Sequence, residues 1–178
     1  MLSGVWETPI GAGRKYMHRG IAAHILGGWN LGAIITAQAG QPFTVTMAQN
    51  LCNCFSTGPI RPNVAGSVGG PKTIQQWFNT AAFVPAAPYT FGNEPPQLVV
   101  GPGLFDIDTS LIKTFRIKEN SSFEVRGEFF NLFNHTNFNT PNPVVYAAAS
   151  GQPSPTAGVI TSTATTSRQV QIGLKLLW

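Results

Sequence analysis

The sequence predicts an all-β protein, an antiparallel meander of strands joined by long loops. Three observations carry this prediction. Only 10% of the 178 residues are charged, whereas about 25% is usual for a soluble globular domain. Glycine and proline number 19 and 14, so turns are frequent and every helical period is interrupted. Apolar and polar side chains alternate with period two over several stretches, which is the pattern of a half-buried strand.

The first strands are expected in the N-terminal quarter. Residues 1–9 alternate loosely and end at a turn signal, which predicts one strand that runs into a hairpin loop. The short apolar stretch 20–26 is compatible with one or two helical turns. Residues 29–38 alternate clearly, with one apolar face and one small or polar face, and predict a second strand. After a Gly-Gln-Pro break, residues 43–47 predict a short third strand.

The middle of the chain, residues 48–102, is expected to be a long loop region because proline and glycine recur throughout it. Long loops of this kind usually carry function. Aromatic side chains within it indicate an ordered loop that packs on something. They could also stack on a carbohydrate or peptide ligand, with self-packing as the alternative reading. These residues are Trp77, Phe78, Phe83, Tyr89 and Phe91.

The C-terminal part carries the clearest strand patterns. Over 104–133, two alternating runs flank a turn signal at 118–121 and predict an antiparallel hairpin. Residues 134–167 form a second loop stretch, rich in asparagine and small residues. Residues 168–178 predict a terminal strand. All of these elements are expected within a single segment, 1–178.

Two environments fit these strands. Their length of about 9–11 residues suffices to cross a bilayer at a tilt, and aromatic side chains lie near several strand ends, as in membrane barrels. The succession Glu124, Arg126 and Glu128 suits a polar barrel lumen. It equally suits the solvated face of a soluble sandwich. The pattern alone therefore leaves a membrane barrel and a soluble all-β protein open.

The charge distribution argues against a nucleic-acid partner. The net charge of +4 arises mainly because acidic residues are few. The densest basic cluster is Arg14, Lys15, His18 and Arg19, and the other basic residues are scattered singly. A nucleic-acid binder is expected to show a basic stripe interleaved with aromatic residues.

No metal or cofactor is expected. One C-x-C, Cys52 and Cys54, is a poor zinc signal without a second ligand pair, and a local disulfide or two free thiols both stay open. His18 and His24 are spaced for neither one helix face nor a tight chelate. The first residues are not those of a signal peptide, and no run of about 18 apolar residues predicts a membrane-spanning helix.

The motifs do not predict catalysis. No Gly-x-Ser-x-Gly nucleophile elbow occurs in the sequence. A weak alternative combines Ser110, His135 and Asp108 as nucleophile, base and orienting carboxylate. His135 is more simply interpreted as part of a capped, asparagine-rich loop.

Two aspartates, Asp106 and Asp108, lie two residues apart and therefore on one strand face. They could act as a carboxylate pair, but carboxylates on strands are more often neutralised by cations across the sheet. We expect Lys113 or Arg126 to neutralise them. The two glycine-rich runs of the chain precede no predicted helix, so a phosphate cradle is not expected.

A set of short motifs occurs in an order that points to one family. They are ETPIGAGR (7–14), GGWNL (27–31), QAGQPFTV (38–45), RPN (61–63), WFNTAAF (77–83), GPG (101–103), DTSLIKTF (108–115) and RGEFFNLFNH (126–135). The series covers nearly the whole chain. It resembles the C-terminal end of the TonB-dependent outer-membrane receptors of the Oar-like type, which contain a carboxypeptidase-regulatory-like domain.

The resemblance implies a bacterial outer-membrane protein that takes up an unidentified ligand, without catalysis of its own. Family members combine a periplasmic domain, a plug with a TonB box and a barrel of about 22 strands. This chain resembles only the last strands, with loops 48–102 and 134–167 contributing to an extracellular ligand surface. Implied partners are outer-membrane lipid, the rest of the barrel and plug, the TonB system and the barrel-assembly machinery. The implied assembly signal is the terminal strand, through Val170, Ile172, Leu174, Leu176 and Trp178.

So few strands cannot close a barrel of that size, and an open strand edge in lipid is not tolerated. We therefore expect a partial barrel of the transmembrane type that other strands complete. Two alternatives concern the isolated chain. One is a self-associating β assembly, because uncapped strand edges template pairing. The other is a free-standing soluble β protein with hydrolase activity of the esterase kind.

Overall fold

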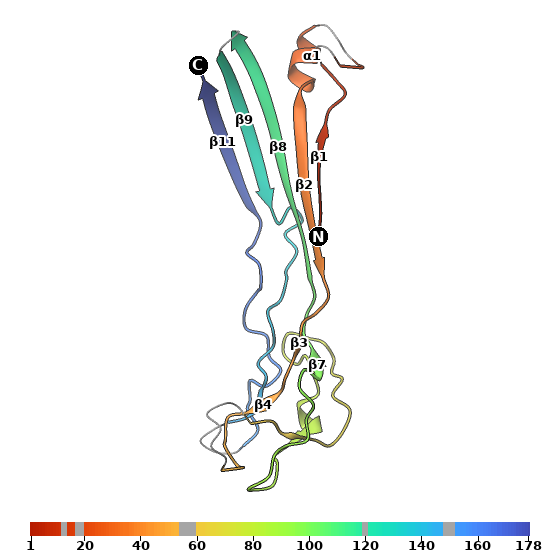
Figure 1. Cartoon of the computed structure of the whole chain (residues 1–178), viewed down its shortest axis with the longest axis vertical. Coiled ribbons are helices and arrows are strands. Elements are labelled where there is room, and N and C mark those ends of the chain that lie inside the picture. The colour runs from red at the N-terminus through yellow and green to blue at the C-terminus, as the bar shows by residue number, and fades with distance from the viewer. Residues whose placement is uncertain (12–13, 17–19, 54–59, 119–120, 148–151) are drawn as a thin grey trace. The chain divides into compact units, whose positions relative to one another are not determined.

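The computed structural model describes residues 1–11, 14–16, 20–53, 60–118, 121–147 and 152–178 (Figure 1). These residues form two compact units. The first, called here the sheet unit, comprises 1–38, 105–136 and 165–178. The second, called the loop unit, comprises 39–104 and 137–164. Each unit is described by itself.

The sheet unit is built on one five-stranded sheet of order β1-β2-β8-β9-β11. Its strands are β1 (Leu2–Glu7), β2 (Trp29–Gln38), β8 (Leu104–Lys118), β9 (Ser121–Phe130) and β11 (Gln169–Leu177). Antiparallel pairing joins β1 to β2, β8 to β9 and β9 to β11. The predicted all-β meander is therefore confirmed. Strands β8 and β9 fall within the range 104–133, and β11 falls within 168–178. The sheet is open, because β1 and β11 stand at its two ends.

The strand register sorts side chains onto two faces. Phe115 pairs with Phe123, which in turn pairs with Leu176, so these three share a face. The apolar face carries Leu2, Trp6, Trp29, Leu31, Ile35, Phe105, Ile107, Leu111, Lys113, Phe115, Phe123, Val125, Phe129, Val170, Ile172, Leu174 and Leu176. The polar face carries Ser3, Glu7, Asn30, Gly32, Asp106, Asp108, Ser110, Thr114, Arg116, Glu124, Arg126, Glu128, Gln169, Gln171 and Lys175, together with the apolar residues Val5, Ile34, Ile112 and Phe130.

The connection between β1 and β2 contains the short helix α1 (Ile21–Leu26), as the apolar stretch predicted. Figure 1 shows α1 at the end of the sheet where β11 ends. The helix stops at Gly27, where an added Cβ would lie 2.4 Å from both Ala23 O and Gly11 Cα. No helix among the described residues has the length and hydropathy needed to cross a bilayer.

The loop unit contains only short strands and one 3-10 turn. They are β3 (Pro42–Phe43), β4 (Thr46–Met47), β5 (Asn63–Val64), β6 (Phe83–Val84), β7 (Val99–Val100), β10 (Val144–Tyr146) and η1 (Thr80–Ala82). Three two-stranded sheets pair β3 with β7, β5 with β6, and β4 with β10. The prediction of one strand over 43–47 is wrong, because Val45 N–H donates to the Glu94 carboxylate at 3.0 Å and leaves no continuous ladder.

Packing in the loop unit centres on Phe78, whose side chain is completely buried. Its ring meets those of Phe43 and Phe83 edge to face, with centroids 5.9 and 5.7 Å apart. Cys52 is disulfide-bonded and belongs to the same core, whereas Cys54 lies outside the described residues. The predicted ordered loop is confirmed: it has an aromatic core of its own.

Candidate functional site

The polar face carries the charged side chains of the strands. Arg126 on β9 lies between two carboxylates, with Nη2 3.1 Å from Glu124 Oε1 and Nη1 3.6 Å from Glu128 Oε1. All three side chains are partly exposed, so these ion pairs contribute little to stability. The two glutamates and one arginine give this exposed strip along β9 a formal charge of −1.

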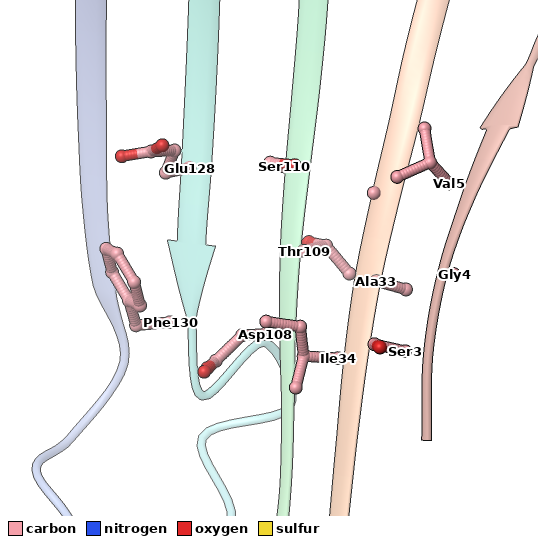
Figure 2. A pocket seen from close by; sticks show the side chains of 11 residues that line it. Ser3, Gly4, Val5, Ala33, Ile34, Asp108, Thr109, Ser110, Glu128 and Phe130 are labelled. Atoms are coloured by element: carbon pink, nitrogen blue, oxygen red, sulfur yellow. The ribbon is translucent and has the colours of Figure 1, made fainter. Parts of the chain in front are cut away.

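A hollow of about 410 Å³ lies over this face. Figure 2 shows the side chains of β1, β2, β8 and β9 that surround it. An added Cβ on Gly32 would lie 2.5 Å from Ser110 Oγ, so glycine lets β2 approach β8 here. The lining mixes hydroxyls, carboxylates and apolar groups, mainly Ser3, Val5, Asp108, Ser110, Glu128 and Phe130. Such a lining offers hydroxyl and carboxylate oxygens for hydrogen bonds beside apolar surface.

Asn131 fixes the chain where it leaves β9. Its backbone is left-handed, with φ 49°, and its N–H donates to Asp108 Oδ1 at 2.9 Å. Its buried amide donates to the carbonyls of His135 and Thr166, both at 3.0 Å, and accepts from His135 N–H at 2.8 Å. One side chain therefore ties the exit of β9 to the approach of β11. The predicted capped loop around His135 matches this geometry.

Two residues of the weak catalytic alternative lie on β8, and the third lies in the loop that follows β9. Ser110 and Asp108 lie on the polar face, and Asp108 accepts the Asn131 amide hydrogen. The His135 ring packs edge to face against Phe105, an apolar-face residue, with centroids 6.0 Å apart. A base must lie within hydrogen-bond reach of the hydroxyl that it activates, and this combination stays a prediction.

The structure divides the loop aromatics into a buried and an exposed group. Phe78 and Phe83 form the core of the loop unit. Trp77 is half-buried, and its Nε1 donates to Val100 O at 2.9 Å. Tyr89 and Phe91 are 78% and 77% exposed. Of these five aromatic side chains, only Tyr89 and Phe91 expose most of their surface to solvent.

Glu94 is a buried residue that the sequence did not point out, because a glutamate in a proline-rich loop reads as solvated. Its side chain is 1% exposed. Oε1 accepts from Val45 N–H, while among the described residues no donor reaches Oε2. Burial raises the pKa of this carboxyl, and the Val45 N–H and the charge of Arg61 partly offset that rise.

Comparison with known proteins decides between the two environments that fit the strands. The family model for the outer membrane beta barrel domain matches residues 1–171. The chain belongs to this family. No curated protein and no solved structure matches it. The protein is therefore a bacterial outer-membrane β-barrel protein, and the soluble sandwich is set aside.

The apolar face of the barrel domain has the dimensions of a lipid-contacting band. Phe105 and Phe115 lie ten residues apart on β8. At about 3.3 Å per residue and a tilt of about 40°, this corresponds to about 25 Å, the height of the apolar band in outer-membrane barrels. Phe115 and Phe123 stack at one border, with centroids 6.4 Å apart.

The expectation that Lys113 neutralises Asp106 and Asp108 is wrong. It lies on the apolar face, opposite Asp106 and Asp108, because odd and even positions of one strand point to opposite sides. Its Nζ donates to the carbonyls of His24 and Ile25 in α1. Arg126 likewise pairs with the glutamates of its own strand.

The terminal strand of the barrel domain occupies one edge of the sheet. Gln169 to Leu177 pair with β9 on one side only. The apolar residues of β11 are all exposed, and Trp178 beyond it is 90% exposed. The implied assembly signal therefore lies on an accessible edge strand: Val170, Ile172, Leu174, Leu176 and Trp178.

Proposed function

We propose that this barrel domain is the C-terminal part of a TonB-dependent outer-membrane receptor of the Oar-like type, which takes up an as yet unidentified ligand. The observation that carries the proposal is the open sheet, with β1 and β11 at its two ends. An unpaired backbone N–H or C=O in hydrocarbon costs several kcal/mol, so both edges require partner strands. The remaining barrel of a larger receptor supplies such strands.

The loop unit supports a receptor function. Barrels of the outer membrane have short periplasmic turns and long extracellular loops. The connection between β8 and β9 is the two residues 119–120, whereas 39–103 and 131–168 are long. We place these long connections outside the cell, where the exposed rings of Tyr89 and Phe91 contact the ligand. Phe78 and Phe83 hold those loops in shape from within.

The terminal strand supports the assembly part of the proposal. Its exposed apolar face and terminal aromatic suit recognition by the barrel-assembly machinery, and its free edge is where a neighbouring strand would be added. The TonB system and a plug are partners of the whole receptor under this proposal. The hollow on the polar face then belongs to the wall of the lumen.

The proposal is tested on the natural polypeptide in its own membrane. An antibody raised against residues 60–100 is used on fractionated cells, with and without boiling before electrophoresis. We expect a band in the outer-membrane fraction that is far larger than 19.0 kDa, shifts on heating and co-purifies with TonB after cross-linking. A soluble monomer of 19.0 kDa would overturn the proposal in favour of the hydrolase alternative. A cross-linked ladder in steps of that mass would replace it with self-association.

A further inference from the structure

The loop unit is almost free of charged residues. Its sequence contains three, Arg61, Lys72 and Glu94, whereas about a quarter of the residues of a soluble domain are usually charged. Glu94 is buried, and the Lys72 ammonium group donates to a backbone carbonyl oxygen at 3.3 Å. Such a unit has little with which to attract or bind a charged ligand.

Two exposed rings of the loop unit lie in one short segment, called here the aromatic turn (residues 87–94). Tyr89 and Phe91 are 78% and 77% exposed. Thr90 and Asn93 are exposed in the same segment, and none of its exposed side chains is charged. Hydroxyl and amide groups donate and accept hydrogen bonds without a net charge. The aromatic turn therefore presents aromatic surface together with neutral polar groups.

Hydrogen bonds hold the aromatic turn to earlier segments of the loop unit. Tyr89 N–H donates to Leu51 O at 2.9 Å. Asn93 N–H donates to Asn63 Oδ1 at 2.9 Å. In return, Asn93 Oδ1 accepts a hydrogen bond of 2.8 Å from Val64 N–H. The turn is therefore tied down on both sides of Phe91 by contacts within the chain itself.

Glu94 and Gly92 fix the end of the aromatic turn. Glu94 N–H donates to Pro62 O at 3.1 Å, and Glu94 O accepts from Arg61 Nη1 at 2.6 Å. The buried carboxyl group of Glu94 accepts from Val45 N–H at 3.0 Å. An added Cβ on Gly92 would collide with the carbonyl oxygens of Arg61 and Pro62, so glycine is needed for this close approach. These contacts also engage the guanidinium group of Arg61 with the backbone.

Tyr89 itself has a left-handed backbone, with φ 64°. This conformation is unfavourable for a bulky residue and is found mainly where the surrounding structure enforces it, often at ligand-binding segments. Thr90 contributes to enforcing it, because its N–H and its hydroxyl group both donate to Ala87 O, at 3.1 and 2.6 Å. The result is a ring that is kept in solvent although the backbone beneath it is firmly held.

We propose that the aromatic turn binds a neutral oligosaccharide, whose sugar rings stack on Tyr89 and Phe91. The proposal rests on the receptor function proposed above and names the class of its ligand. One face of a pyranose ring consists of C–H groups of slight positive charge, which suit the electron-rich face of an aromatic ring. The hydroxyl groups at the edge of the sugar require neutral donors and acceptors, such as Thr90 and Asn93. A peptide, in contrast, would bring charged groups to a unit that has few charges to pair with them.

The first test exposes the natural polypeptide, purified from outer membranes in detergent, to an array of neutral, acidic and basic oligosaccharides and of short peptides. We expect it to bind neutral oligosaccharides. The affinity for the oligosaccharide that binds best is then measured by calorimetry at low and at high salt, and it should not change, because no ion pair contributes to it. Binding confined to charged oligosaccharides or peptides, a marked loss of affinity at high salt, or no binding to any member of the array would overturn the proposal.

Variants of the two rings test whether the aromatic turn is the binding site. Tyr89→Asn, which tolerates the left-handed backbone, and Phe91→Ala should each weaken binding about tenfold, the effect of one stacked ring. The matched control is Tyr16→Asn, which removes an exposed ring of the sheet unit and should leave the affinity unchanged. Phe91→Tyr should retain the affinity, whereas Phe91→Leu should lose it, because leucine keeps apolar area without a ring. Equal effects of Tyr89→Asn and Tyr16→Asn, or full affinity in Phe91→Leu, would refute the stacking site.

This experiment and the test of the receptor function fail independently of each other. A large outer-membrane protein that binds only charged ligands would keep the receptor function and lose the neutral oligosaccharide. A soluble chain of 19.0 kDa that binds neutral oligosaccharides through Tyr89 and Phe91 would do the reverse. Thermal unfolding of each variant shows that it is folded, since exposed side chains contribute little to stability.

Discussion

Replacing Lys113 by methionine tests the contact that holds α1 on the sheet. Methionine keeps the apolar stem and removes the ammonium group, which leaves His24 O and Ile25 O without their charged donor. Two charge-assisted hydrogen bonds at about 1.5 kcal/mol each, the low end of their range, give about 3 kcal/mol. Solvent does not weaken these two hydrogen bonds appreciably, because Lys113 is 2% exposed. This free energy corresponds to about a 150-fold rise in local opening of the α1 connection.

Limited trypsin digestion under native conditions measures this opening, because the connection contains the cleavage sites Arg14 and Lys15. When opening is fast relative to cleavage, the rate follows the population of the open form. We expect Lys113→Met to be cut about 100-fold faster there, with global unfolding in urea no easier, because a cation has left the lipid-contacting face. Lys175→Met, an exposed lysine of the polar face, is the control. An unchanged cleavage rate in Lys113→Met would refute the conclusion that Lys113 holds α1 on the sheet. A loss of global stability without faster cleavage would mean that Lys113 stabilises the sheet instead.

Three further predictions concern the strand contact, the buried acid and the loop core. Gly32→Val should destabilise the refolded barrel domain by about 1–3 kcal/mol in a urea titration, because the new side chain overpacks against β8. Gly4→Val, which has open space at Cβ, should change the free energy of unfolding little. Equal effects of the two substitutions would contradict the close approach of β2 to β8. Burial raises the pKa of Glu94 above 4.5, so between pH 4.5 and the raised pKa the folded loop unit binds more protons than the unfolded chain. The free energy of unfolding should therefore fall as the pH rises from 4.5 through the raised pKa. Glu94→Gln should abolish this dependence on pH, and a dependence that persists would assign it to another group. Phe78→Ala should cost about 3–5 kcal/mol and Phe91→Ala under about 0.5 kcal/mol in thermal unfolding, and similar costs would mean that Phe91 packs in the core.

Local periodicity was enough to predict the sheet. Over 29–38 and 104–133, alternation reports which side chains share a face, and the hairpin turn is adjacent in sequence to the strands it joins. The strand expected at 43–47 failed for a different reason. Val45 gives its N–H to Glu94, 49 residues away, and no local pattern encodes such a partner. A hydrogen bond of long sequence separation thus overrides the strand propensity of Phe43 and Val45.

The candidate site could be predicted only where one strand supplies its charged residues at every second position. The strip formed by Glu124, Arg126 and Glu128 is visible from spacing alone, because one strand supplies all of it. Lys113 was expected to pair with nearby aspartates, and its true partners are carbonyls 88 and 89 residues away in α1. Backbone acceptors carry no signature in a sequence. The role of Asn131 is partly readable, since asparagine favours left-handed turns, but its link to Thr166 is not.

The distribution of burial differs between the two units. Among the described residues, all of the largest fully buried side chains belong to the loop unit, among them Phe78, Phe83 and Met47. The described residues of the sheet form no comparable core, so under the proposed function its order depends on lipid on one face and on strands added at its edges. The loops, in contrast, are held by their own packing. Under the proposed receptor function, Tyr89 and Phe91 are carried on loops that are already folded before a ligand arrives, so binding would not have to order those loops.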